Sequence, residues 1–229
     1  MITRRVSNQG FTLVELLTVI AIIGVLAALV MLALGRVRES ARRSTCANNL
    51  RQIASGLFLY ASEHQRQLPP VSKSWPPASQ QDTWGYAIWS YIGYRNEDFN
   101  DPANDLVFQN GGVPDRNIFQ CPTTQVDPTP APGVNLRSSP YSYGLNSNPI
   151  GSGTVYWTAS VRLNQIKTPA QTAMVLESDF PLADSAGYRL WYGMIPHAGG
   201  TNVAFYDGHI ELRTSDTISG DETKPFWGK

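Results

Sequence analysis

The feature that most constrains this chain is an apolar run of 24 residues near the N-terminus, Phe11 to Leu34, with the sequence FTLVELLTVIAIIGVLAALVMLAL. It contains one charged residue, Glu15, and no proline. At about 1.5 Å per residue, a helix of this length reaches roughly 36 Å and can cross a hydrocarbon core of about 30 Å. The run is apolar on every side, which is unusual for the surface helix of a globular protein. We therefore predict a transmembrane helix over residues 11–34; the alternative is a helix buried in a soluble core.

A short polar segment, residues 1–10, precedes the run and ends at Gly10. Its only charges, Arg4 and Arg5, favour a cytoplasmic N-terminus. More positive charge follows the span, at Arg36, Arg38, Arg42 and Arg43, so loop charge alone does not define the orientation. A secretory signal would place its small-residue cleavage site after an apolar run of about 7–15 residues. Here the run is longer and the small residue precedes it, so we predict a different kind of leader.

Residues Gly10 to Leu17, GFTLVELL, resemble the processing site of type IV prepilins and type II secretion pseudopilins. The resemblance implies that a prepilin peptidase cleaves between Gly10 and Phe11 and that Phe11 is then methylated. It also implies that Glu15 pairs with the N-terminal amine of a neighbouring subunit and that the C-terminal domain lies outside the cytoplasm. A carboxylate inside a span costs about 2–3 kcal/mol, and pairing makes that cost tolerable. The alternative is a plain membrane anchor with an accidental match.

The helical pattern continues beyond the span as an amphipathic helix over residues 35–68. No proline occurs before Pro69, and we expect the helix to end near Ser62. Apolar residues recur at helical spacing, at Leu50, Ile53, Ala54, Leu57, Phe58 and Ala61. This part of the helix can therefore be the spine of a folded domain. Gly35, at the end of the span, either allows a local bend or permits close packing.

Residues 69–214 are predicted to form an extracytoplasmic domain. All 16 prolines and all six tryptophans lie at or after residue 69. The fold class we expect is α+β and pilin-like, with the long N-terminal helix packed against a small antiparallel sheet. A short helix should follow Asp82 as its N-cap. Strands are expected over residues 117–121, 141–143, 155–161, 173–178, 201–206 and 209–213. The last two should be joined by a type I′ turn at Asp207-Gly208, and residues 215–229 should form a polar, mobile tail.

Three separated segments resemble a narrower pseudopilin-like, DUF1559-like subfamily. They are CANNLRQI from Cys46, FQCP from Phe119, and an H-X9-DG element in which nine residues separate His197 from Asp207-Gly208. Their order along the chain makes the combined match more specific than any one of them. Because the role of this subfamily is poorly defined, the resemblance informs fold more than function.

The H-X9-DG element leaves two interpretations open. In the first, His197 hydrogen-bonds a carbonyl or Asp207 across the sheet and has a structural role. In the second, His197, Asp207 and His209 hold a divalent metal ion, for which two histidines and a carboxylate are suitable ligands. Calcium is a further alternative, because major type II pseudopilins carry it in a C-terminal loop; the acids here are Asp179, Asp184 and Asp207, without EF-hand spacing. No cofactor is expected beyond these alternatives.

The chain has two cysteines, Cys46 and Cys121. In an oxidising compartment they can form a disulfide, which persists there. The bridge would close a loop of about 76 residues and contribute about 4–5 kcal/mol in the chain-entropy model. The alternative is two free, buried thiols.

The predicted function is that of a structural subunit and not of an enzyme. The chain has 18 basic and 18 acidic residues, which argues against general nucleic-acid binding. It lacks Gly-x-Ser-x-Gly, a phosphate-binding loop and His-Glu-x-x-His. We expect a single-pass inner-membrane pseudopilin or minor pilin-like subunit with a periplasmic C-terminal domain. Its partners would be prepilin peptidase, other pilin subunits, an inner-membrane assembly platform and membrane lipid. The alternative is a membrane-tethered binding or metal-binding domain that uses a pilin-like export signal.

Overall fold

The computed structural model forms two compact units, Met1–Ala41 and Arg42–Lys229, which we consider separately. The residues that the structure describes are 12–73, 82–95, 118–123, 142–150, 158–178, 182–183, 196–197, 199–214, 216–218 and 225–228.

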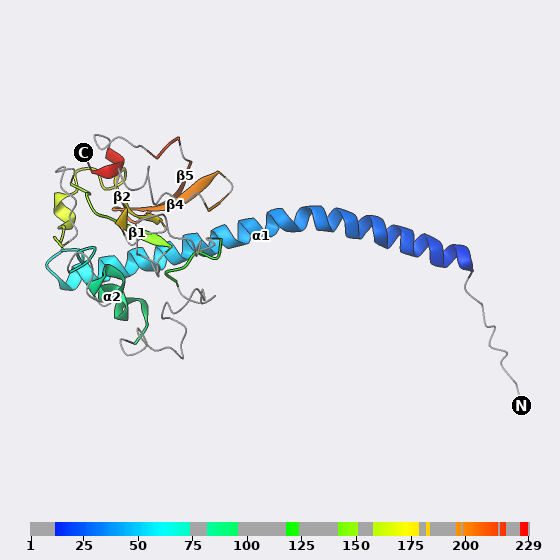
Figure 1. Cartoon of the computed structure of the whole chain (residues 1–229), viewed down its shortest axis with the longest axis horizontal. Helices are drawn as coiled ribbons and strands as arrows, with labels where there is room; N and C mark the ends of the chain where they lie inside the picture. The colour runs from blue at the N-terminus through cyan, green and yellow to red at the C-terminus, as the bar shows by residue number, and fades with distance from the viewer. Residues whose placement is uncertain are drawn as a thin grey trace, which may run out of the picture. The chain divides into compact units, whose positions relative to one another are not determined.

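The described residues of the first unit are Thr12 and the start of helix α1 (Leu13–Glu63), which carries the label α1 in Figure 1. Its large apolar side chains are exposed within the chain; Leu26 and Leu29, for example, are 56% and 60% exposed. The most apolar stretch of α1 has no buried residue and is long and apolar enough to cross a membrane. The predicted helix is confirmed, with ends within two residues of those expected.

In the second unit, one face of α1 is buried. The fully or nearly fully buried side chains recur every three or four residues, at Cys46, Leu50, Ile53, Ala54, Leu57 and Ala61. Phe58 is half-buried, and Gly56 lies so close to Ile92 that an added Cβ would come within 2.5 Å of its Cγ2 atom. The apolar face predicted from Leu50 to Ala61 is therefore buried, but the helix ends at Glu63 and not at residue 68, and its buried face begins at Cys46. At Gly35 the chain stays helical, and no atom lies within 4 Å of an added Cβ, so the chain shows no close packing there.

Helix α1 is followed by two residues in the left-handed conformation, Gln65 and Arg66, with φ of 54° and 61°. The Arg66 N–H donates to the Ala61 carbonyl at 2.8 Å, which satisfies one of the last acceptors of the helix. Two residues later, the Leu68 N–H donates to the Val161 carbonyl at 2.9 Å. The turn therefore directs the chain away from the helix before Pro69 is reached. We call residues 69–229, the part of the second unit that follows the helix, the outer domain, after the position predicted for it.

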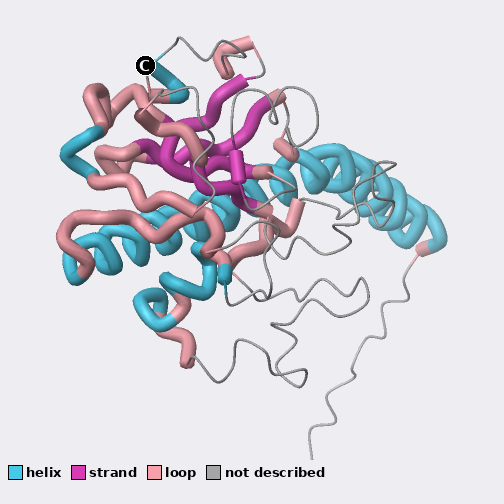
Figure 2. The backbone as a smooth tube through the Cα atoms, turned by 60° about the vertical axis from the view of Figure 1, so that its left-hand side comes forward, coloured by secondary structure: helices cyan, strands magenta, loops and turns pink. Residues whose placement is uncertain are grey.

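Within the described residues, the sheet has five strands: β1 (Tyr143–Asn146), β2 (Ala173–Glu177), β3 (Leu182–Ala183), β4 (Gly200–Phe205) and β5 (Ile210–Thr214). Their order is β3-β1-β2-β4-β5. The four longer strands are antiparallel to their neighbours, which confirms the predicted α+β fold, and only the two-residue strand β3 runs parallel to β1. Figure 2 shows these strands in magenta beside the helix. Leu145 and Val175 share a hydrophobic cluster with the buried face of α1.

The C-terminal segment corrects one prediction. It was expected to be polar and mobile, but residues 225–227 form a 3₁₀ turn, η7 (Pro225–Trp227), in which Phe226 and Trp227 are 7% and 2% exposed. Both side chains join a second cluster with Leu176, Val203 and Phe205 of the sheet. Charged and polar neighbours mask this short aromatic segment in the sequence, yet its two large rings bury enough apolar surface to hold it in place.

Three local predictions are also wrong. Residues 118–123 form turns where a strand was expected, and the described part of the 155–161 segment, from residue 158, is not a strand either. Helix α2 (Trp84–Ile88) has Thr83 at its N-cap position instead of Asp82. The turn at 118–123 instead buries Phe119, whose ring meets the Trp84 ring edge-on at 5.6 Å. The aromatic packing of Phe119 therefore favours the turn conformation of residues 118–123, and strand propensity alone does not predict such packing.

The β4–β5 hairpin forms as predicted but closes differently. The Phe205 N–H donates to the His209 carbonyl at 3.0 Å, and the Gly208 N–H donates to the Phe205 carbonyl at 2.9 Å. Gly208 has a φ of 92°, whereas Asp207 is not among the positive-φ residues. The loop is therefore a three-residue turn with glycine in the left-handed position, and not a two-residue type I′ turn.

Candidate functional site

The start of α1 is closed by a reciprocal cap between Thr12 and Glu15. The Thr12 N–H and hydroxyl donate to Glu15 Oε2 at 2.8 and 2.7 Å, and the Glu15 N–H donates to Thr12 Oγ1 at 3.2 Å. This is a capping box, which satisfies backbone donors at a helix N-terminus. In the single chain, Glu15 is thus bonded within its own helical turn. Gly10 and Phe11 lie outside the described residues.

A second candidate site lies in the core of the outer domain, around the two cysteines. Cys46 of α1 and Cys121 of the 118–123 turn are fully buried and joined by a disulfide, with their Cα atoms 4.9 Å apart. Two further bonds support this junction. The Tyr143 hydroxyl donates to the Cys46 carbonyl at 3.3 Å, and the Asn49 amide donates to the Gln120 carbonyl at 3.0 Å. Burial, with the nearby charge of Glu177, raises the pKa of Tyr143 well above its usual range, so its hydroxyl stays a neutral donor.

His197, the histidine of the H-X9-DG element, lies against this disulfide. Its Nε2 atom is 3.6 Å from Cys121 Sγ and 2.9 Å from Glu177 Oε1, and its side chain is almost fully buried. Its backbone is fixed by two hydrogen bonds with Gly200, at 2.8 and 3.2 Å, at the start of β4. We refer to Cys46, Cys121, Glu177 and His197 as the Cys–Glu–His cluster.

Glu177, at the end of β2, is the central acceptor of the cluster. Its Oε1 atom accepts from His197 Nε2 and Asn202 Nδ2, and its Oε2 atom accepts from Thr201 Oγ1 and the Asn202 N–H at 3.0 and 2.6 Å. A buried carboxylate is costly unless its oxygens are bonded, and here each oxygen has two donors. The cluster therefore ties β2 and β4 to the disulfide. Glu177 was not predicted as a site residue, although a lone acid ending an apolar strand, AMVLE, was a usable signal.

Asp207 and His209 lie elsewhere, at the exposed end of the hairpin. Asp207 Oδ1 accepts from the His209 N–H at 3.1 Å and contacts its Nδ1 at 2.5 Å. Burial acts to raise the pKa of Asp207, but these bonds and the His209 charge outweigh it and lower that pKa. The His209 ring also stacks on Phe205, with centroids 4.3 Å apart. The polar atoms of Asp207 thus find their partners within the hairpin, in His209.

The predicted metal set His197, Asp207 and His209 is therefore not brought together. His197 precedes β4 and Asp207 follows it, and six strand residues at about 3.3 Å each separate the two ends by roughly 20 Å. For the same reason, His197 bonds Glu177 and not Asp207. Of the acids considered for calcium, Asp179 and Asp184 lie outside the described residues.

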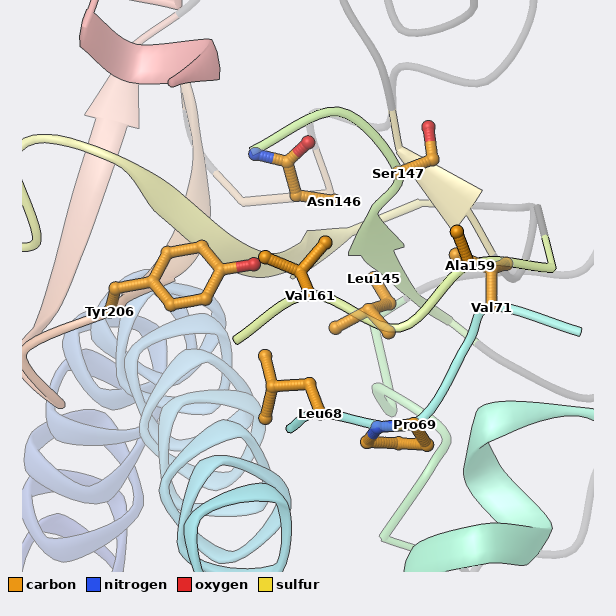
Figure 3. Close-up of a pocket in the computed structure, with 9 residues that line it drawn as sticks. All are labelled: Leu68, Pro69, Val71, Leu145, Asn146, Ser147, Ala159, Val161 and Tyr206. Atoms are coloured by element: carbon orange, nitrogen blue, oxygen red, sulfur yellow. The ribbon is translucent and has the colours of Figure 1, made fainter. Parts of the chain in front are cut away.

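A small hollow lies between the end of α1 and the sheet. Leu68, Leu145 and Val161 crowd it, with Asn146 and Tyr206 at its edge (Figure 3). Its volume is about 10 Å³, room for about one water molecule. Small-molecule sites usually have several hundred Å³, so this hollow is far smaller than a typical ligand pocket.

Comparison with known families agrees with this architecture. A family model described as a protein of unknown function (DUF1559) matches residues 35–162, more than half of the chain. The chain belongs to the DUF1559 family. A model of the prokaryotic N-terminal methylation motif also matches, over residues 5–31, so the resemblance noted at GFTLVELL is confirmed. The DUF1559 match ends before His197 and Glu177, so the Cys–Glu–His cluster draws on residues outside the matched segment.

Two curated relatives have roles in filaments or secretion. The chain is 29% identical over 130 residues to the type IV major pilin protein PilA of Myxococcus xanthus. The aligned region covers 54% of this chain and 56% of PilA. It is 29% identical over 102 residues to the type II secretion system core protein G of Klebsiella michiganensis, covering 36% of this chain and 72% of that protein. The chain thus spans little more than half the length of PilA. No solved structure is significantly similar to it.

Proposed function

We propose that this chain is a structural subunit, pseudopilin or minor pilin-like, of a type II secretion or type IV pilus-like filament. The observation that carries the proposal is the pairing of an N-terminal methylation motif with an apolar helix whose side chains are uncovered within the chain. The similarity to PilA and to core protein G supports the same conclusion. The subunit would be made as a prepilin, cleaved by prepilin peptidase between Gly10 and Phe11, and methylated on Phe11.

Before assembly, the apolar half of α1 would be covered by lipid of the inner membrane. The N-terminus would be cytoplasmic and the outer domain periplasmic, an oxidising place in which the Cys46–Cys121 disulfide would persist. In the filament, neighbouring subunits would cover the same side chains. An inner-membrane assembly platform would move the subunit from the membrane into the filament. The helix would thus carry assembly, and the outer domain would carry surface contacts.

Glu15 would supply the specificity of that transfer. Lipid tails are as apolar as a neighbouring helix, so moving the helix from lipid into a filament gains little hydrophobic free energy. A charge pair between Glu15 and the amine of a neighbouring Phe11 would add a directional attraction. It would replace or share the local bonds that Glu15 now accepts from Thr12. The pairing would therefore define the register of adjacent helices.

The alternative, a tethered binding or metal-binding domain, has less support. The hollow near Tyr206 holds about one water, and the ligand set proposed from the H-X9-DG element is not assembled. Neither of these two features favours that function over the subunit role.

The decisive experiment compares Glu15→Ala with Glu39→Ala, which removes the same charge from α1 outside the motif. We expect both variants to reach the membrane, and Glu15→Ala alone to be lost from filaments. The loss should be roughly tenfold or more, since about 1.4 kcal/mol at one contact is a tenfold change in association. Sheared filament fractions and membrane fractions are quantified by immunoblot, and mass spectrometry tests for a methylated Phe11 N-terminus. Equal incorporation of the Glu15→Ala variant and the wild type would refute the proposal.

A further inference from the structure

The Cys–Glu–His cluster gathers four side chains of metal-binding chemistry at one buried point. Cys46, Cys121 and Glu177 are fully buried and His197 is 2% exposed. One ligand atom from each residue lies within 4.8 Å of those of the other three. They come from α1, the 118–123 turn, the end of β2 and the residue that bridges to the start of β4. In the oxidised chain the two sulfurs are bonded to each other, so neither is a thiolate ligand.

We propose that reduction of the Cys46–Cys121 disulfide converts this cluster into a Cys₂–His–Glu zinc site. Zinc would then join the same four segments that the disulfide and the His197–Glu177 pair join in the oxidised chain. The four segments would be linked by the disulfide in the oxidised chain and by zinc in the reduced chain. This inference is independent of the assembly role of α1.

The spacing of the donor atoms suits a tetrahedral ion. Zinc lies about 2.3 Å from sulfur and about 2.0–2.2 Å from nitrogen or oxygen, which puts neighbouring ligand atoms roughly 3.3–3.8 Å apart. His197 Nε2 is already 3.6 Å from Cys121 Sγ and 2.9 Å from Glu177 Oε1. The largest change is between the two sulfurs, which must move apart to about 3.7 Å once their bond is broken. The remaining adjustments are about an ångström.

The surroundings of Glu177 also suit a ligand. If Oε1 binds zinc, Oε2 keeps its bonds from Thr201 Oγ1 and the Asn202 N–H. Ligating carboxylates and histidines are held by such outer hydrogen bonds, which fix their orientation. Four protein ligands and full burial leave no position for water. The site would therefore be a closed, structural one and not a catalytic one.

The chemistry balances with a phosphine as the reductant. The phosphine and one water reduce the disulfide to two thiols and leave as phosphine oxide. Zinc then displaces one proton from each thiol, because thiolate is the ligand form. Nε2 of His197 must also present its lone pair, so the proton that it shares with Glu177 moves to Nδ1 or to solvent. A mild oxidant that re-forms the disulfide would remove both thiolates and release the ion.

The test uses the full chain in detergent, reduced with a phosphine or left oxidised, then equilibrated with Zn²⁺ and desalted. We expect about one retained zinc per reduced chain, none above background in the oxidised chain, and release of the ion on reoxidation. Replacing Zn²⁺ with Co²⁺ should give thiolate-to-metal charge-transfer bands and the intense visible bands of tetrahedral cobalt. Cys46→Ala/Cys121→Ala and Glu177→Gln should lose or weaken retention, whereas the matched control His209→Ala, in the exposed hairpin, should retain the ion fully.

Three results would overturn the proposal. One is a reduced wild-type chain that retains no zinc. Another is zinc retention that does not depend on reduction, as shown by equal retention in the oxidised chain, or that is lost in His209→Ala. The third is a cobalt complex without thiolate bands. Circular dichroism of each variant reports folding, and the cobalt spectrum of the wild type decides the question even if a variant fails to fold.

Discussion

The two parts of helix α1 on either side of the boundary at Ala41, which we call its first and second halves, are both helical. They differ in whether the chain itself buries their apolar side chains. Leu26, in the first half, is 56% exposed within the chain, whereas Leu57, in the second, is fully buried against the outer domain. The first half is apolar around its whole circumference, so no single face can be covered by a sheet. The second half is apolar on one face and covers it with its own domain. A chain can thus bury the apolar side chains of one stretch of a helix internally and leave those of another stretch exposed within the chain.

Their acids differ in the same way. Glu15 is bonded within one helical turn to Thr12, while Glu63, near the other end of α1, accepts from Tyr91, 28 residues away. A hydrogen bond within one helical turn can be exchanged for another without unfolding of the domain, whereas a hydrogen bond between distant residues is part of the tertiary structure. The long-range bond of Glu63 therefore contributes to the tertiary structure, whereas the bond of Glu15 is compatible with the exchange of partners proposed above.

The largest effect that separates the two halves is expected from the disulfide. Cys46→Ala/Cys121→Ala should lower the free energy of unfolding of the outer domain by about 4–5 kcal/mol, from the loop entropy of a 75-residue separation. Membrane insertion of the first half should not change. Denaturant unfolding of the full chain in detergent with a chelator measures the first effect, and alkaline extraction of membranes measures the second. A loss of insertion would show that the halves are not independent.

Matched leucines test the comparison directly. Leu57→Ala should cost about 2–5 kcal/mol, because it leaves a cavity in the core. Leu26→Ala should change the stability of the outer domain by less than about 0.5 kcal/mol, because its side chain is exposed within the chain. Both values come from the same unfolding experiment. Similar costs for the two leucines would contradict the division drawn here.

Matched glycines should give a smaller difference. In Gly56→Ala, the new methyl would clash with Ile92, at a cost of about 1–3 kcal/mol, while alanine favours the helix by about 1 kcal/mol. We expect a net loss of about 1 kcal/mol in the midpoint analysis of outer-domain unfolding. Gly24→Ala meets no atom within 4 Å and should leave outer-domain stability unchanged. A stabilised Gly56→Ala variant would show that Ile92 can move aside.

The smallest effect concerns the Tyr91–Glu63 bond of 2.6 Å, which raises the pKa of Tyr91 to about 12. Because the folded pKa is above the ordinary value of about 10, the bond stabilises the fold fully below pH 10 and is lost as the pH rises through about 12. Tyrosine NMR should show Tyr91 titrating earlier in Glu63→Gln than in the wild type. Tyr91→Phe should change stability by less than about 0.5 kcal/mol at neutral pH. An unshifted titration in Glu63→Gln would rule out this cause.

Sequence reasoning was most successful where a pattern is repeated. The ends of α1, its buried face from Leu50 to Ala61, strand β2 and the β4–β5 hairpin follow from periodicities that many residues share. It failed where one or two large side chains decide. Phe226 and Trp227 hold a segment expected to be mobile, and Phe119 helps to make a turn where a strand was expected. Such contacts depend on what lies opposite, which local patterns do not encode.

The Cys–Glu–His cluster shows the same limit of prediction from local sequence patterns. The three members of the H-X9-DG motif, His197, Asp207 and Gly208, are conspicuous in the sequence, but β4 separates the histidine from the other two. The partner of His197 is Glu177, twenty residues earlier, which no motif marks. A search for buried acids in predicted apolar strands would have found it.

The sequence by itself determined that the N-terminal helix is long and apolar on all sides and that an N-terminal methylation motif overlaps its start, since both are properties of consecutive residues. It also determined the amphipathic face on which the outer domain is built. Only the tertiary structure decided that Cys46, Cys121, Glu177 and His197 meet. The physical reason is that this meeting requires a helix, a turn and two strands to pack on one core, and packing depends on the shapes of surfaces distant in sequence.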